Sequence, residues 1–519
     1  MTRDASAIGA GLAPVRRARR ILSGERLHVI GVAGAGASAA ALLAHHAGAL
    51  VTGCDAGGAS PYTPALEAEG LTLAWQHSPD HVTSAPAPDR VAVTKALTAV
   101  DPDHPELRAA VAASIPLESW QQVVADAAVG RTLVGVAGTH GKSTTAGWLV
   151  HVLVHAGLDP AAFVGALLPS VITGGLPSTA RAGRGAPFVV EADEYAGNFD
   201  AYRPDVAVIT SAEWDHPDVF ADGVAVTDTF ERWLRAMPDG GTIVANAGDP
   251  GVETVLDHVV QTAARRVVAY ALTEADPRRG GYLRGVAERF GGDGRPATPL
   301  IGRITSADPD GTTLEIHGLG AATGAVATRL RTAGRHNAAN ALAVAGAAMS
   351  LGVPPEAIVT ALGSFEGVGR RLERKGEAAG VVVYDDYGHH PTAIRETLTA
   401  IRQREPGRRV WAVYEPLTYH RTAALLPAFA DALATADAVV VADIWAGRDP
   451  DTTVASAAGL AEAVARARPG IQVEAPGDVE ASADWLAHEV RAGDAVLVMG
   501  GGHSYRIAEG LLRRLGSED

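Results

Sequence analysis

The sequence GVAGTHGKSTT at residues 135–145 combines glycines, a lysine and hydroxyl side chains at a spacing that suits a polyphosphate. Glycines let the backbone approach phosphate closely, and a helix that begins there turns the positive end of its dipole toward the anion. Lys142 can reach β- and γ-phosphates, and Ser143 can bind Mg²⁺. Only three lysines occur in the chain, which favours a function for Lys142. The segment is therefore predicted to bind a nucleoside triphosphate.

The elements beside this loop fit the same chemistry. The apolar run 132–137 predicts a buried strand and 144–155 predicts a helix, so the turn between them comprises Gly138, Thr139, His140 and Gly141. The general P-loop spacing is not met, because Val136 occupies the position of its first glycine. The strand, turn and helix nevertheless place backbone N–H groups where a phosphate would lie.

Two later strands are predicted to end in acidic residues. The run 187–190 leads into Glu191, Asp193 and Glu194, and the run 206–210 leads into Glu213, Asp215, His216 and Asp218. Ligands of open α/β sheets bind at the carboxyl ends of strands. Carboxylates there can hold divalent cations against ATP oxygens together with Ser143, and His216 implies a second, less oxygen-selective site.

A second glycine-rich loop lies near the N-terminus. A strand over 27–30 leads into GVAGAGASA, with Gly31, Gly34 and Gly36 at the start of a helix expected over 39–47. The strand 50–53 is followed by Asp55, which could accept a hydrogen bond from a ribose or a base. Alone, this pattern would also suit a nicotinamide oxidoreductase, but that interpretation leaves the lysine loop and both acidic strand ends without a role.

Composition limits the remaining possibilities. The 519 residues suffice for about three domains, and the formal charge of −15 disfavours a general binder of nucleic acids or membrane surfaces. A single cysteine, Cys54, excludes an intrachain disulfide and a metal site built from several cysteines. No apolar run approaches the roughly 20 residues of a membrane span. Residues 1–23 are interpreted as a disordered or loosely docked extension.

Further segments complete the predicted organisation. We expect strands at 90–94 and 115–116, a helix at 105–113, and a small antiparallel sheet within 274–331. Residues 334–340 begin a helix with His336, Asn337 and Asn340, whose amides suit an adenine edge. A glycine hinge at 367–371 ends in Arg371. It precedes a strand at 381–384 and the segment DDYGHHPT at 385–392.

Six ordered motifs give the chain a specific resemblance to the Mur ligase family. They are GVAGAGAS, GTHGKST, EADE, the E-x-D-H-x-D run, RHNAANALA and DDYGHHPT, and the resemblance covers roughly residues 27–512. It implies an α/β fold of three domains: a Rossmann-like, UDP-sugar-binding domain at 24–130, a P-loop-type central ATPase domain at 131–366, and a Rossmann-like, amino-acid-binding domain at 367–519. Departures from the family's pattern include Cys54 and residues 93–96.

The resemblance also implies roles for individual residues. It assigns the UDP-sugar to Gly31, Gly34, Gly36, Ser38 and Asp55, and metal ions to Ser143, Glu191 and His216. Catalysis would depend on Lys142, His216, Arg371 and His389, and the amino acid would bind Tyr419 and Arg421. ATP would contact Gly138, Thr139, His140, Gly141, Lys142, Ser143, Thr144, His336, Asn337 and Asn340. The general base stays open among His216, His389 and His390.

Within the family, the motifs are most similar to those of members that join L-alanine to UDP-N-acetylmuramate with ATP and Mg²⁺ in peptidoglycan precursor synthesis. The alternative is the recycling reaction, which joins a murein tripeptide to the same nucleotide sugar. A binding protein without turnover is disfavoured by the intact Lys142, Glu191 and His216. We expect a cytoplasmic monomer or weak homodimer that binds neither nucleic acid nor membrane.

Overall fold

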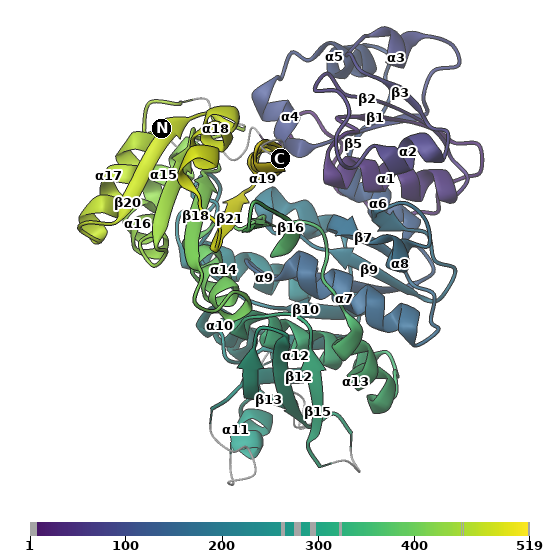
Figure 1. Ribbon diagram of the computed structural model, residues 1–519. Coiled ribbons are helices and arrows are strands. Elements are labelled where there is room, and N and C mark those ends of the chain that lie inside the picture. The colour runs from purple at the N-terminus through teal and green to yellow at the C-terminus, as the bar shows by residue number, and fades with distance from the viewer. Residues whose placement is uncertain are drawn as a thin grey trace.

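The computed structural model describes residues 8–260, 265–274, 282–290, 297–320, 324–447, 449 and 451–516. Three β-sheets, each covered by helices, lie in sequence order and define a first, a middle and a third domain (Figure 1). Their strands span residues 26–119, 132–330 and 373–500. This is the predicted three-domain α/β architecture, and the expected boundaries at 130 and 366 fall between the sheets.

The first domain is a five-stranded parallel sheet of order β3-β2-β1-β4-β5. The order reverses between β1 and β4, which places the loop after β1 where doubly wound folds bind ligands. Its elements are β1 (Arg26–Ile30), α1 (Ala35–His46), β2 (Leu50–Cys54), α2 (Pro64–Ala68), β3 (Thr72–Ala74), α3 (Asp80–Thr83), β4 (Arg90–Val93), α4 (Lys95–Val100), α5 (Pro105–Ala112), β5 (Leu117–Ser119) and α6 (Trp120–Ala127).

Two expectations for this domain need correction. The strand predicted at 115–116 is β5, two residues later, because Pro116 has no N–H and contributes only its carbonyl to Val91. The glycine-loop helix begins at Ala35 instead of residue 39, since Gly34 is already its extended N-cap residue. The loop is therefore shorter than the glycine pattern suggested.

The middle domain is a ten-stranded sheet of order β15-β14-β13-β12-β11-β10-β6-β9-β7-β8. Its elements are β6 (Thr132–Ala137), α7 (Lys142–His155), β7 (Ala161–Leu168), α8 (Ser170–Thr173), β8 (Ser178–Arg181), β9 (Pro187–Glu191), the 3₁₀ segment η2 (Tyr195–Ala201), β10 (Val206–Ile209), α9 (Gly223–Arg235), β11 (Thr242–Asn246), α10 (Pro250–Val259), β12 (Arg266–Leu272), α11 (Tyr282–Arg289), β13 (Thr298–Asp308), β14 (Gly311–His317), β15 (Val326–Leu330), α12 (Arg335–Ser350) and α13 (Pro355–Ser364).

The antiparallel strands expected within 274–331 exist, but they do not form a sheet of their own. β13, β14 and β15 run antiparallel to one another, and β13 pairs in parallel with β12. They therefore extend the central sheet. Residues 275–281, 291–296 and 321–323 of this segment lie outside the described residues.

The third domain is a six-stranded sheet of order β16-β17-β21-β18-β19-β20, parallel except for β16. Its elements are β16 (Glu373–Ala378), β17 (Val381–Asp386), α14 (Pro391–Arg404), β18 (Arg409–Glu415), α15 (Tyr419–Ala424), α16 (Leu426–Leu433), β19 (Ala438–Ala442), α17 (Ala457–Ala467), β20 (Gln472–Gly477), α18 (Val479–Glu489), β21 (Asp494–Gly500) and α19 (Tyr505–Gly516). The two apolar faces of this sheet form separate buried clusters.

Apolar packing joins the first domain to the middle one. Helix α1 contacts strands β7 and β8, and one continuous buried cluster includes residues of both domains. Trp120 packs edge-on against Phe163 at 5.1 Å between ring centroids. Lys95 of the first domain donates to the carbonyls of Ala196 and Gly197 in η2. These contacts fix the glycine loop of the first domain beside the acidic end of β9.

The N-terminal extension is docked, contrary to the expectation of a disordered or loose segment. The guanidinium of Arg16 bridges Glu118 and Asp126, with its closest contacts at 2.7 Å. Buried Arg90 contacts the same two carboxylates. Because these partners belong to β5 and α6, the segment from residue 8 onward is part of the first domain. Residues 1–7 lie outside the described residues.

Among the described helices, none is both long and apolar enough to cross a membrane.

Candidate functional site

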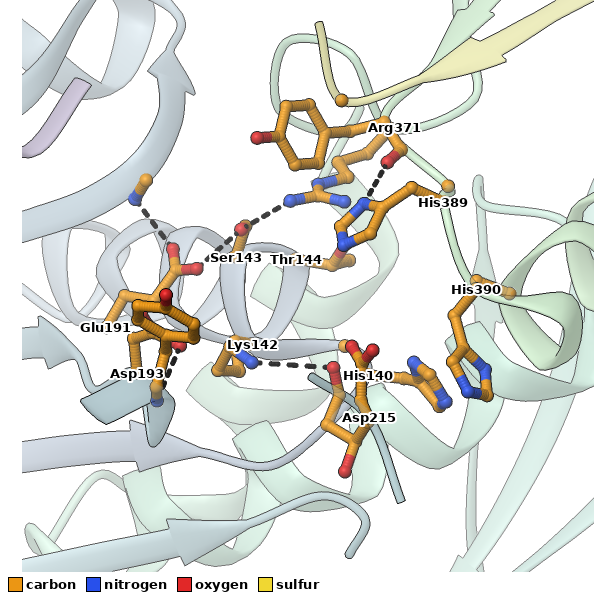
Figure 2. A pocket seen from close by; sticks show the side chains of 18 of the residues that line it. His140, Lys142, Ser143, Thr144, Glu191, Asp193, Asp215, Arg371, His389 and His390 are labelled. Atoms are coloured by element: carbon orange, nitrogen blue, oxygen red, sulfur yellow. Dashed lines mark hydrogen bonds between the residues drawn. The ribbon is translucent and has the colours of Figure 1, made fainter. Parts of the chain in front are cut away.

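A cavity of about 1010 Å³ lies where the three domains meet. Its wall includes the loop after β1, the lysine loop after β6, the acidic end of β9, the start of α12 and the DDYGHHPT segment of the third domain. Because most of the wall consists of strand ends and helix starts, the backbone contributes many of its polar groups. Figure 2 shows the charged and imidazole side chains of this wall.

The lysine loop requires glycine at both ends. Gly138 has a φ of 136° and Gly141 a φ of 78°, conformations that L side chains rarely adopt. A Cβ on Gly141 would lie 2.5 Å from Oδ1 of Asn340 on α12. Gly141 is the N-cap residue of α7, so this helix begins at Lys142, two residues before the predicted start. The first N–H groups of α7 are thus directed at the cavity.

Lys142 is held in place by a backbone carbonyl and one buried glutamate. Its Nζ donates to the carbonyl of Gly138 at 2.6 Å and lies 3.1 Å from Oε2 of Glu194, which is 1% exposed. Burial opposes its charge, but Glu194, Asp193 and Glu191 outweigh that effect and raise the pKa of Lys142. Burial also raises the pKa of Glu194, against the attraction of Lys142. Lys142 is therefore a charged ammonium at the cavity wall.

Ser143 and Glu191 form a first pair of oxygen ligands that could hold a metal ion. The hydroxyl of Ser143 donates to Oε1 of Glu191 at 2.8 Å, and Oε2 accepts from the N–H of Gly165 at 2.6 Å. Arg371 of the third domain donates to the same hydroxyl at 2.8 Å, and its guanidinium stacks on Tyr387. Figure 2 shows Ser143, Glu191 and Arg371 directed toward one another. A hydroxyl and a carboxylate are ligands that Mg²⁺ accepts.

His216 belongs to a second group. One ligand atom each from Asp193, Glu194 and His216 lies within 4.8 Å of the others. Carboxylates with an imidazole suit a less oxygen-selective divalent cation than the Ser143–Glu191 pair does. The predicted metal residues therefore fall into two sets, Ser143 with Glu191, and His216 beside Asp193 and Glu194. His216 has a φ of 56°, a strained value for a non-glycine residue.

Arg421 connects the third domain to this second group. Its Nε lies 2.9 Å from Oδ1 of Asp215, and its Nη2 lies 2.9 Å from Nδ1 of His216. Although burial opposes ionisation, Arg421 and then His216 hold the pKa of Asp215 well below its usual range. The Arg421 side chain is 4% exposed. Arg421 and Tyr419, both predicted to bind the amino acid, do not line the cavity in this state.

Imidazoles form a third group at the same interface. His140 of the lysine loop and His390 of the third domain lie 4.7 Å apart between ring centroids. Figure 2 shows the two rings next to each other. Glu213 accepts from His140 and from Thr392, each at 2.8 Å. Burial, and then the charge of His140, lowers the pKa of His390 to about 4. Burial, followed by Arg421, lowers the pKa of His389 well below its usual value.

The adenine residues proposed from the sequence cluster at the start of α12. His336, Asn337 and Asn340 all line the cavity. The amide of Asn337 donates to the Ala333 carbonyl at 2.7 Å, and Nδ2 of Asn340 donates to Oδ1 of Asn337 at 3.2 Å. The two asparagines are thus held rigidly by each other, which orients the groups they present.

The first-domain residues divide into two groups. Gly31, Gly34 and Gly36 line the cavity, whereas Ser38 and Asp55 do not. Asp55 accepts from the N–H groups of Ala33 and Gly57 and so shapes the loop. Ser38 is buried and bonds Thr179 of β8 across the domain contact. In the middle domain, Gly138, which was predicted to contact ATP, does not line the cavity either.

The predicted residues that the structure brings together on the wall are Thr139, His140, Gly141, Lys142, Ser143, Thr144, Glu191, His216, His336, Asn337, Asn340, Arg371 and His389, besides the three first-domain glycines. Several other wall residues were not singled out from the sequence: Lys95, Asn198, Asn246, Tyr387, Glu396 and Trp445. The rarity of lysine is a signal that could have identified Lys95. Tyr387 lies within the DDYGHHPT motif, in which His389 was predicted as a catalytic residue.

Three family models match the chain in consecutive segments. The Mur ligase family catalytic domain matches residues 26–132, the Mur ligase middle domain matches 136–348, and the Mur ligase glutamate ligase domain matches 370–502. Together these matches cover most of the chain, with one match for each sheet. The chain therefore belongs to the Mur ligase family of ATP-dependent ligases.

Among relatives, a UDP-N-acetylmuramate–L-alanine ligase of Frankia casuarinae is 35% identical over 95% of this chain and 98% of its own. The crystal structure of a UDP-N-acetylmuramate–alanine ligase from Thermotoga maritima has a TM-score of 0.75, 23% identity, and coverage of 95% of this chain and 100% of its own. A murein peptide ligase from Psychrobacter arcticus has a TM-score of 0.69, 25% identity, and coverage of 95% and 99%.

Proposed function

We propose that this protein is an ATP-dependent ligase that joins L-alanine to the carboxylate of UDP-N-acetylmuramate, as the name of its 35% identical relative describes. The observation that carries the proposal is the cavity itself. Residues of three domains surround it, and they include a glycine-rich loop with a lysine, carboxylates of the kind that hold cations, and arginine and imidazole groups. A reaction that combines a triphosphate, a nucleotide sugar and an amino acid needs such a junction.

In the first step, the muramate carboxylate attacks the γ-phosphate of ATP, ADP leaves, and an acyl phosphate forms. Both reactants are anions, so the barrier is largely electrostatic. Lys142 and the N–H groups at the start of α7 oppose the negative charge of the phosphates, and Arg371 approaches from the third domain. The Ser143–Glu191 pair and His216 would hold divalent cations, which neutralise phosphate charge when bound.

In the second step, the amine of L-alanine attacks the acyl carbon and phosphate leaves, while the amine gives up a proton. Burial lowers the pKa of His389 and of His390, so both are neutral near pH 7, the form that a general base requires. Nδ1 of His389 lies 2.8 Å from the Tyr387 carbonyl, whereas His390 would have to release Thr392 or Trp214 before it accepts a proton. His216, His389 and His390 therefore all remain our candidates for this role. Closure of the third domain excludes water, which would hydrolyse the acyl phosphate.

The other assignments follow the same cavity wall. We propose that His336, Asn337 and Asn340 contact adenine, and that the glycine loop of residues 31–36 contacts the diphosphate of the sugar nucleotide. Tyr419 and Arg421 are proposed to bind the amino acid. For Arg421 this requires that the α-carboxylate share or replace its contact with Asp215. A guanidinium fork suits a carboxylate in either arrangement.

The deciding assay compares L-alanine with L-Ala-γ-D-Glu-meso-diaminopimelate as acceptors, in parallel ATP-dependent ligations to UDP-N-acetylmuramate. A tripeptide carries its terminal carboxylate two residues farther from the amine, about 7 Å in an extended chain, so one arginine does not hold both acceptors in line. We expect turnover with L-alanine, weak leakage to glycine and serine, and none with the tripeptide. A higher kcat/KM for the tripeptide would establish the recycling reaction instead.

A further inference from the structure

The first domain contains a buried cluster of histidine, cysteine and glutamate side chains outside the cavity. Ligand atoms of His28, Cys54, His81 and Glu106 all lie within 4.8 Å of one another. None of these residues lines the cavity described above. They come from β1, the end of β2, α3 and the first turn of α5, so four elements of the domain core converge on one point.

The individual distances show that the other three side chains surround the carboxylate of Glu106. The Cys54 thiol donates to Oε2 of Glu106 at 3.0 Å, and Nε2 of His28 lies 3.6 Å from the same oxygen. Nδ1 of His81 lies 2.7 Å from Oε1. A tetrahedral zinc ion with ligands at about 2.0 to 2.3 Å holds its ligand atoms about 3.3 to 3.8 Å apart. The distances of 2.7 and 3.0 Å lie below this range and that of 3.6 Å lies within it, so the side chains would have to move slightly apart to admit the ion.

Burial and orientation separate this cluster from ordinary polar packing. His28 is 2% exposed, and Cys54 and Glu106 are fully buried. Nε2 of His28 is directed at the cluster and has no hydrogen-bond partner among the described residues, a costly state for a buried nitrogen. The other ring nitrogen of His28 bonds Thr52 at 2.8 Å. Metal-binding histidines are typically fixed in this way through their second nitrogen.

Residues next to the cluster also favour these four side chains as ligands. The N–H of Ser78 donates to Oε1 of Glu106 at 2.8 Å and orients the carboxylate. His77 lies 3.3 Å from the sulfur and, like His81, is partly exposed, which gives an entry path. Burial, and then Glu106, raises the pKa of the Cys54 thiol. The cysteine is therefore protonated without a cation, and a bound cation would displace that proton to solvent.

We propose that His28, Cys54, His81 and Glu106 form a structural zinc site that joins β1, β2, α3 and α5. Two nitrogens, one sulfur and one carboxylate oxygen suit zinc better than magnesium or calcium, which prefer oxygen ligands. All four positions are supplied by the protein, and no substrate group reaches them from the cavity. The site is thus distinct from the cations of the ligase reaction, and the inference does not depend on the proposed function.

Cobalt offers a direct test on the full-length protein without an affinity tag, after treatment with a chelator. Tetrahedral Co²⁺ bound to a thiolate has a charge-transfer absorption in the near ultraviolet, and Cys54 is the single cysteine of the chain. We expect this band on addition of about one equivalent of Co²⁺ and its loss when Zn²⁺ is added. Zinc should also raise the Tm, since it binds the folded state preferentially.

The variants Cys54→Ser and His81→Gln test the ligand set, with His46→Gln of the same domain as the matched control. His46 lies on α1, outside the cluster. We expect zinc affinity to fall by at least about tenfold in the first two variants and to stay unchanged in the control. Tenfold is the lower bound because it is already the typical loss when a residue that only hydrogen-bonds a metal ligand is removed. Because cavity residues can also bind cations, zinc content is measured as the difference between parent and Cys54→Ser.

Absence of the cobalt band in the parent protein, with equal zinc content in parent and Cys54→Ser, would overturn the proposal. The cluster would then be a buried hydrogen-bond network centred on Glu106. The cobalt measurement uses the unmodified chain, so a folding defect of a variant does not obscure that part of the test. Ligase turnover is measured separately, and its failure would not affect the zinc result.

Discussion

At the scale of single residues, Gly141 is the position where side-chain size has the sharpest consequence. Its φ of 78° and the 2.5 Å approach of Asn340 to a would-be Cβ combine strain with a clash. We expect Gly141→Ala to raise the KM for ATP by at least about tenfold, because the start of α7 and Asn340 must move apart. Steady-state kinetics at varied ATP concentration measures this change.

The matched control is Gly157→Ala. Gly157 follows α7, has a φ of 73°, and has open space where a Cβ would lie. Both variants incur the left-handed strain of about 1 to 2 kcal/mol, but only Gly141→Ala adds the clash with Asn340. A KM increase of the same size in Gly157→Ala would trace the effect to strain in α7 and not to the Asn340 contact.

Lys142 is expected to matter for chemistry and little for the sugar nucleotide. We predict that Lys142→Ala lowers kcat by at least about 100-fold, the typical loss for one group that stabilises developing charge. UDP-N-acetylmuramate should bind almost as tightly as in the parent, because its proposed loop lies on another domain. Phosphate release and calorimetric titration provide the two readouts.

Two checks accompany Lys142→Ala. Removal of the ammonium leaves Glu194 buried without its partner, and its already raised pKa means that it takes up a proton. Thermal unfolding therefore has to show a folded variant. Lys375→Ala is the control, since Lys375 lies in the third domain outside the cavity wall. Parent-rate phosphate release from Lys142→Ala would refute the role of the lysine loop.

At the scale of elements, the N-terminal segment stabilises the first domain through Arg16. We predict that Arg16→Gln lowers the free energy of unfolding by about 1.5 to 3 kcal/mol, because Asp126 is fully buried and loses charged hydrogen bonds. Arg17→Gln is the control, since Arg17 is exposed beside it. Urea unfolding of both variants measures the difference, and equal stabilities would show that the Arg16 guanidinium contributes nothing.

Elements that depend on their own residues were predicted from the sequence, whereas contacts between distant residues were not. The strand β6 was predicted at its observed bounds because its apolar run lies between a polar residue and the glycine turn. The docking of Arg16 was missed because its partners lie 102 and 110 residues farther along the chain. The zinc-type cluster has no local pattern either, since its four ligands come from four separate elements. The cavity residues were predictable only where a motif names them.

At the scale of the whole molecule, the third domain contacts the middle one through buried polar groups. Arg371 reaches Ser143, Arg421 reaches Asp215, and His390 reaches the carbonyl of Trp214 at 3.3 Å. The pairing of Arg421 with Asp215 joins residues 206 positions apart, so no sequence motif could reveal it. The interface leaves both imidazoles of the DDYGHHPT segment neutral, because burial outweighs the nearby carboxylates of Asp215 and Glu213.

This interface should weaken in acid. The folded pKa of His390, about 4, lies below the roughly 6.5 of an unperturbed histidine, so the unfolded state binds more protons between these values. The free energy of unfolding therefore falls as the pH drops below about 6.5, by about 2 kcal/mol at pH 5 from this group. Unfolding is measured by denaturant titration at a series of pH values.

His390→Asn isolates the contribution of this histidine. Nδ1 of His390 accepts from the N–H of Thr392 as the N-cap of α14, and asparagine provides the same kind of cap without titrating. The variant should retain more of its neutral-pH stability at pH 5 than the parent does. An identical slope of stability against pH in both proteins would rule out His390 as the source.

The burial of Cys54 has a practical consequence for observing domain motion. No other cysteine occurs in the chain, and this one is shielded within the first domain, so the native protein offers no accessible thiol to a maleimide reagent. Two cysteines introduced on exposed faces of the first and third domains can thus carry a donor and an acceptor dye with Cys54 left in place. The energy transfer between them would follow the third domain in real time as each substrate binds.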